Sequence, residues 1–219
     1  MTSTEKFIEQ LAARAKPVRP LAPAWVRACT WLLVAAAVIA LATSLFGMRP
    51  HLLTLMLRPA AGMEWIGSLL TGVLAAFAVF QLSVPGRDAR WAWLPVPALL
   101  LWAGGIGMGC LGELLRGQFG YDPRALQCAR DVALVSLPIA VVMLVMVRHA
   151  ALARPRSTAL LGALAAAALS SAGVGLFHAG ETAAMGLLGH LLAVLVLSAL
   201  AGVASRGLFR AVGAWRPLL

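Results

Sequence analysis

Charged residues are scarce in this sequence. Asp, Glu, Lys and Arg make up only 12% of the 219 residues, whereas soluble globular domains average about 25%. A soluble protein of this size could not cover its surface with so few charges. Hydrophobic residues make up 61% of the chain, and the mean hydropathy is +0.89. The composition therefore excludes an ordinary soluble domain and predicts an all-α, polytopic membrane protein.

Motifs of common enzymes and pumps are also absent. The sequence contains no P-loop, no G-x-S-x-G nucleophile motif and no H-E-x-x-H zinc motif. The apolar segments carry no run of carboxylates that could relay protons, and the chain shows no internal repeat of the kind found in transporters. We therefore expect no enzyme activity, no catalytic residues and no resident cofactor.

Long apolar runs dominate what is present. About twenty apolar residues cross the hydrocarbon core as a helix, and five of six runs reach that length. The fourth run is shorter, so its span must include charged residues at its ends to reach that length. The sequence predicts a six-helix transmembrane domain over residues 24–205, between a head at 1–23 and a tail at 206–219. The predicted spans are 28–48, 65–86, 91–112, 130–147, 157–177 and 182–205.

Lys and Arg residues are distributed unequally between the two sides of this predicted bundle. If the N-terminus is cytoplasmic, thirteen of the 18 lie inside. The five outside are Arg49, Arg58, Arg116, Arg124 and Arg130. This excess satisfies the positive-inside rule, so we predict that both termini are cytoplasmic. It also explains the net charge of +10 without direct binding of nucleic acid.

The head has the pattern of a short amphipathic helix. Phe7, Ile8 and Leu11 fall on one helical face, and prolines follow at positions 17, 20 and 23. The inner loops are too short to hold a soluble domain. A cytoplasmic partner must therefore use the head, these loops or the tail, and an amphipathic helix suits a helix-in-groove contact. The same pattern is also compatible with a helix lying on anionic lipid.

Two cysteines flank the predicted outer loop. Cys110 and Cys128 could form a disulfide there. A thiolate could also bind a soft metal ion with His51 or His178 as an imidazole partner. The alternative for Cys110 is simple packing within a Gly-rich helix. Cys128 lies beside Arg130 and Asp131, and this polar setting favours a functional role.

Two ionisable residues suggest a different class of function. His190 lies within the sixth predicted span, and an ionisable group inside a span is a functional candidate. A neutral His bonded to a neighbouring helix is the alternative. Glu64 lies at the predicted outer start of the second span, where it would complement the helix dipole. A small transporter or channel using His190 and Glu64 is therefore the alternative function.

Several segments match one family in order and spacing. They are LAARAKPVRPLAP in the head, EWIGSLLTGVLAAFAVFQLSVPGRDARWAWLPVPALLLW from Glu64 to Trp102, CARDVALVSLP from Cys128 to Pro138, RPRSTALLGALAAAALSSAGVGLFH, and the closing GLFR. With them the chain resembles the NrsF-type anti-sigma factors, which are small six-helix proteins of the bacterial inner membrane. The resemblance covers nearly the full length.

The resemblance implies a multi-pass protein that holds an extracytoplasmic-function sigma factor at the membrane. An envelope, heavy-metal or oxidative signal would release that sigma factor. The predicted sigma-binding residues are Phe7, Ile8, Leu11, Arg14, Lys16 and Arg19. The predicted sensing residues are Cys128, Cys110 and His178, with a transient heavy-metal ion at Cys128 and His178. The family associates two outward cysteines with the response, and one matches Cys128. The second belongs where this chain has Ala179.

Overall fold

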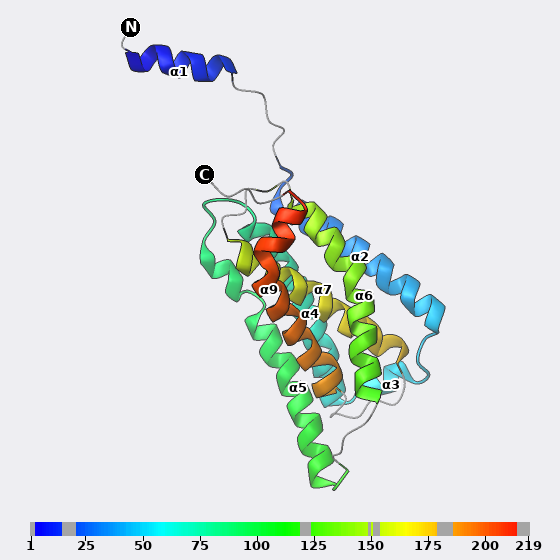
Figure 1. Ribbon diagram of the computed structural model, residues 1–219. Coiled ribbons are helices and arrows are strands. Elements are labelled where there is room, and N and C mark those ends of the chain that lie inside the picture. Colours follow the sequence, from blue (N-terminus) through cyan, green and yellow to red (C-terminus); the bar gives the residue numbers. More distant parts are fainter. Residues whose placement is uncertain are drawn as a thin grey trace.

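Helices form nearly all of the structure, a computed structural model that describes residues 3–14, 21–118, 124–148, 150, 154–178 and 186–213. No strand occurs in these ranges. In chain order the elements are α1 (Ser3–Arg14), α2 (Ala24–Phe46), α3 (Leu52–Met56), α4 (Pro59–Leu82), the 3₁₀ helix η1 (Ala89–Trp93), α5 (Val96–Leu115), α6 (Arg124–Val147), α7 (Pro155–Phe177), the π-helix η2 (Gly186–Leu192) and α9 (Ala193–Ala211) (Figure 1).

Six helical stretches are long and apolar enough to cross a membrane, which confirms the predicted count. They are α2, α4, η1 with α5, α6, α7, and η2 with α9. The exposed surface of these helices is rich in large apolar side chains, as at Leu33, Leu45 and Val203. Lipid covers such a surface in a membrane-spanning bundle. The observed architecture is therefore consistent with a multi-pass membrane protein.

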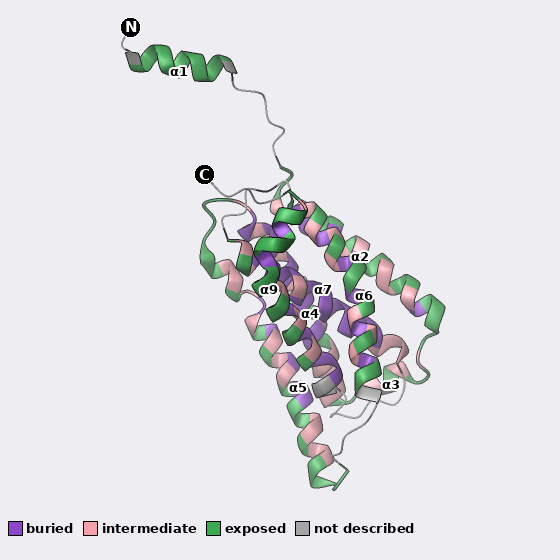
Figure 2. Ribbon diagram, viewed as in Figure 1, coloured by how far each residue is buried: buried purple, intermediate pink, exposed green. Residues whose placement is uncertain are grey.

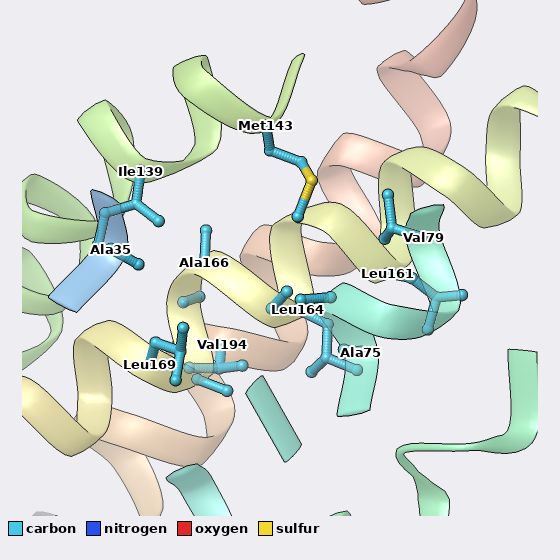
Figure 3. Close-up of a cluster of buried hydrophobic side chains, with 14 of the residues drawn as sticks. Ala35, Ala75, Val79, Ile139, Met143, Leu161, Leu164, Ala166, Leu169 and Val194 are labelled. Atoms are coloured by element: carbon cyan, nitrogen blue, oxygen red, sulfur yellow. The ribbon is translucent and has the colours of Figure 1, made fainter. Parts of the chain in front are cut away.

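α7 lies at the centre of the bundle. It contacts α2, α4, α6 and α9, and 72% of its most apolar window is buried. Its small side chains, including the buried run 165–168, let neighbouring helices approach closely. Figure 2 shows burial concentrated on α7 and the inner face of α4. Apolar side chains from five helices meet around α7, among them Ala35, Val79, Ile139 and Val194 (Figure 3).

The bundle has two distinct ends. Near the start of α2, the Arg27 guanidinium donates hydrogen bonds to Phe80 O and Ser83 Oγ, so α2 begins where α4 ends. We call this the head end. At the opposite end, Arg49 N donates to Leu176 O, so α2 ends beside the end of α7. We call this the far end. Arg27, predicted to precede the first span, is instead a buried residue within α2.

α6 is longer than the sequence predicts. It has 24 residues because the helix continues through Arg130 and Asp131 back to Arg124. Arg130 Nη2 lies 2.9 Å from Asp131 Oδ1, and Asp131 Oδ2 lies 3.6 Å from His178 Nδ1 at the end of α7. These contacts hold the charged side chains at the far end. The extra turns bring Cys128 into the helix.

Glu64 also differs from its predicted position. α4 begins at Pro59, so Glu64 lies in the second turn and not in the first. A carboxylate stabilises a helix dipole mainly within the first turn. The predicted dipole role of Glu64 is therefore wrong. The prediction failed because Pro59, a favourable first residue for a helix, adds a full turn ahead of the apolar run.

Two glycines allow α4 and α5 to pack at close range. A Cβ on Gly67 would lie 2.5 Å from Trp102 N, and a Cβ on Gly105 would lie 2.6 Å from Glu64 N. Backbone atoms cannot move aside, so an added methyl group must separate the helices. We expect Gly67→Ala to lower stability by about 1–3 kcal/mol, the usual range for overpacking. Thermal unfolding in detergent would measure this change.

Gly107 provides the matched control for that substitution. It lies on the same helix as Gly105, and a Cβ there would meet no described atom within 4 Å. Gly107→Ala should therefore leave the midpoint temperature of thermal unfolding unchanged or raise it slightly. Equal midpoints for Gly67→Ala and Gly107→Ala would contradict the close approach of α4 and α5.

Candidate functional site

Cys128 lies on the second turn of α6 and is completely buried. It packs within the main apolar cluster of the bundle. The sequence placed it in a polar setting because Arg130 and Asp131 follow closely. That interpretation is wrong, since successive helical residues point in different directions. Arg130 is exposed, whereas Cys128 and Val132, four residues apart, face inward together.

His190 reaches Cys128 from another helix. It lies in η2 and is only 3% exposed. Its Nε2 lies 2.7 Å from Cys128 Sγ, and its Nδ1 lies 2.7 Å from Ser171 Oγ on α7. We call Cys128, His190 and Ser171 the buried thiol site. Single-turn π segments occur often at functional sites, and η2 is such a segment at the start of a span.

The buried thiol site can hold its protons in two arrangements. A neutral imidazole has one N–H donor and one acceptor nitrogen. In the first arrangement, Cys128 donates its thiol proton to Nε2, and Nδ1–H donates to Ser171. In the second, Ser171 donates to Nδ1, and Nε2–H donates to the Cys128 sulfur. Both arrangements keep the thiol and the imidazole neutral, which their burial favours, because transfer of the thiol proton to the imidazole would leave two charges in an apolar site.

Sequence reasoning only partly anticipated this site. The alternative that His190 bonds a neighbouring helix is confirmed, with two partners from two helices. Ser171 was missed because small hydroxyl residues are common in apolar helices and usually bond their own backbone, as Ser170 does to Ala166 O. Only the placement of α7 against η2 distinguishes these two adjacent serines.

Two small cavities lie near the buried thiol site and the charged residues of the far end. One, of about 40 Å³, is lined by His190, Ser171 and Glu64, among others. That volume is enough for water. The other, of about 190 Å³, is lined partly by Arg49, Arg58, Arg116, Glu64 and Glu113. Glu64 lines both cavities.

The other predicted sensing residues do not join Cys128. All three cysteines lie in described parts of the chain, and none forms a disulfide. Cys110 is half-buried on α5. His178 pairs with Asp131, one turn beyond Cys128 on α6. Among the described residues, no group of three or more His, Cys, Asp or Glu is arranged to hold a metal ion.

The structure describes only part of the predicted sigma-binding face. Phe7, Ile8 and Leu11 are all exposed on α1, which lies apart from the bundle in Figure 1. The side chain of Arg14 and the whole of Lys16 and Arg19 fall outside the described residues, as does Ala179.

One protein family matches almost the entire chain. Its description is NrsF, negative regulator of sigma F, and the match covers residues 11–210. The chain belongs to this family. Membership implies that the protein is a negative regulator of a sigma factor. The matched range contains all three residues of the buried thiol site, whereas Phe7 and Ile8 precede it. No curated protein and no solved structure matches the chain.

Proposed function

We propose that this NrsF-family protein is an anti-sigma factor of the bacterial inner membrane. It would hold an extracytoplasmic-function sigma factor at the cytoplasmic face and release it when a signal acts at the far end. The observation that carries the proposal is the family match over residues 11–210. Regulation would work by binding alone, without a catalysed reaction, a resident cofactor or direct contact with nucleic acid.

The proposed topology places the head end and both termini in the cytoplasm. The distribution of Lys and Arg supports it, since only five of the 18 belong to the far end. Three of those five arginines line the cavity that also holds Glu64 and Glu113, so acidic residues offset their charge. The basic head and inner loops would then face the cytoplasm and the anionic inner leaflet.

The proposed sigma contact is the exposed apolar face of α1. Phe7 and Ile8 are each 59% exposed, and Leu11 is 55% exposed. An isolated helix of 12 residues is marginally stable in water, so this helix gains from packing against a partner. A groove on the sigma factor would bury the apolar face, and Arg14, Lys16 and Arg19 would meet acidic groups around it.

The proposed signal acts on Cys128 through the buried thiol site. A reaction of the thiol, or its binding of a soft metal ion, would break the Cys128–His190 contact and free the imidazole for a new partner. That contact joins α6 to η2, and the second imidazole nitrogen joins η2 to α7. A change there can therefore shift the packing between three spans. Release of the sigma factor would follow as a population shift of the bundle.

Transport through His190 and Glu64 receives less support. The two residues do line one cavity, as the alternative requires, but its volume is only about 40 Å³. Both nitrogens of the His190 imidazole are also engaged, by Cys128 and Ser171.

Photo-cross-linking in living cells would test the proposed function together with its topology. A photoreactive amino acid at Gln10, on α1, should form an adduct with a sigma factor, and mass spectrometry of the adduct would identify its class. The matched control is Gln118, an exposed residue at the far end. An adduct from Gln118, or repeated failure to capture any sigma factor from the head, would count against the proposal.

A further inference from the structure

An apolar groove lies between α6, α7 and α9, in the half of the bundle nearer the head end. Its volume is about 170 Å³. Two of its lining side chains, Val79 and Met143, are labelled in Figure 3. Along α6 the groove extends from Leu137 to Val147, or about 15 Å of helix rise. That length is about half of a ~30 Å hydrocarbon core, so the groove matches the depth of one leaflet.

Two exposed arginines lie at the head end of this groove. Arg148 directly follows Val147, and Thr158, which also lines the groove, donates a hydrogen bond to Arg154 O. Both arginine side chains are exposed, and neither forms an ion pair or a hydrogen bond within the described part of the chain. The sequence contains no Asp or Glu from residue 132 to residue 180. This corner of the bundle is therefore positively charged, and nearby acidic side chains do not offset it.

The groove and the two arginines together specify an occupant. A long arginine side chain can lie along apolar surface while its charged group stays at the membrane interface. A groove one leaflet deep, with guanidinium groups at its polar end, is complementary to a molecule with an anionic head and an apolar chain. In a membrane-spanning bundle, anionic phospholipids are the available molecules of that kind. A soluble acidic protein would match the arginines but would leave the groove unfilled.

We propose that this groove binds one anionic phospholipid of the head-end leaflet. Its phosphate contacts Arg148 and Arg154, and one acyl chain lies against α6, α7 and α9. Guanidinium groups suit this role because their planar N–H donors can bind two phosphate oxygens at once. Lipid binding requires neither the sigma factor nor a particular orientation of the bundle, so this inference and the proposed function can fail separately.

The helices that form this groove also carry the buried thiol site. α6 holds Cys128 near its other end, and α9 continues from η2, which holds His190. Leu137 and Val147 of α6 and Phe209 of α9 all line the groove, so a bound acyl chain contacts both helices. A change in the packing of α6 against α9 therefore alters the lipid site. By linkage, bound lipid in turn favours one arrangement of the two helices.

Native mass spectrometry of the full-length protein in mild detergent would test this inference, with phosphatidylglycerol and phosphatidylethanolamine of identical acyl chains added at equal concentration. We expect the parent to retain one phosphatidylglycerol, with about a tenfold preference over phosphatidylethanolamine. Arg148→Gln with Arg154→Gln should abolish that preference, a tenfold loss equivalent to about 1.4 kcal/mol. Arg87→Gln with Arg90→Gln is the control, because it removes the same charge from exposed head-end residues that lie away from the groove.

Val141→Trp tests the groove without changing any charge. Val141 lines the groove and is 50% exposed, so a larger side chain there can occupy the groove while the fold is kept. Retention of phosphatidylglycerol should fall about tenfold. Val145→Trp is the matched control, because Val145 is 42% exposed on the same helix and does not line the groove. This control should retain the lipid as the parent does.

Several results would overturn the proposal. A parent protein that retains no lipid, or that retains the two lipids equally, would do so, as would unchanged retention in Val141→Trp. Equal losses in the two arginine double variants would show only a general attraction of anionic lipid to a basic surface. An unchanged lipid preference in Arg148→Gln with Arg154→Gln, together with lost co-purification of the sigma factor, would assign these arginines to a protein contact.

Discussion

Replacing Phe7, Ile8 and Leu11 together with Ser is expected to raise sigma-dependent transcription to the level of a strain that lacks this protein. Full burial of one such side chain contributes about 1.5–3 kcal/mol. All three are more than half exposed in the unbound chain, so most of that contribution remains available to a partner. Losing several kcal/mol would weaken sigma binding by more than about a hundredfold. A transcriptional reporter and co-purification of the sigma factor would measure the two effects.

The opposite face of the same helix supplies the control. Glu9→Ser with Ala13→Ser changes two exposed residues of α1 and leaves the apolar face intact. This variant should repress transcription as the parent does. Deleting residues 1–16 should match the triple Ser variant. If the deleted protein still co-purifies with the sigma factor, the head is not the contact, and α1 lying on anionic lipid becomes the better interpretation of its apolar face.

Substitutions in the buried thiol site are expected to separate signal response from repression. Cys128→Ser removes the thiol, and His190→Phe keeps a ring of similar size without its nitrogens. Cys128→Ser keeps a hydrogen-bonding group opposite His190 and should retain basal repression, whereas His190→Phe breaks the Cys128–His190 contact and should raise basal transcription. Both should lower induction by cadmium or a thiol oxidant by about tenfold or more, since thiolate formation underlies the reactivity of a cysteine. Reporter induction against dose would measure this loss.

Further variants distinguish this site from its neighbours. Ser171→Ala removes only the partner of His190 Nδ1, so it should shift the pH dependence of induction while leaving the thiol in place. Cys110→Ser should respond like the parent, because Cys110 is not bonded to Cys128. Normal induction in both Cys128→Ser and His190→Phe would show that the buried thiol site is not the sensor. Loss of induction in Cys110→Ser alone would identify Cys110 on α5, and not Cys128, as the sensing residue.

The buried thiol site bears on the second cysteine that the family resemblance implies. The resemblance described under Sequence analysis implies a second cysteine at position 179, where this chain has Ala. His190 supplies a nitrogen 2.7 Å from the sulfur of Cys128. Under the proposed function, Cys128 and His190 would form the pair that a thiol-directed signal meets in this protein.

The lengths and hydropathy of the apolar runs determined the number of spans from the sequence alone. The positions of Lys and Arg determined the unequal number of basic residues on the two sides of the bundle. These features depend on one helix at a time, because a span must satisfy its own backbone hydrogen bonds in lipid. The amphipathic face of the head is equally local, since Phe7, Ile8 and Leu11 are neighbours on a single helix. No contact between distant residues was needed for any of these predictions.

The tertiary structure decided where the chemistry lies. Cys128 and His190 are 62 residues apart, and neither residue type specifies its partner. They meet because α6 extends back to Arg124, because small residues bring α7 close to its neighbours, and because η2 turns His190 inward. Each of these outcomes depends on several helices at once, so no periodicity along a single segment could reveal it.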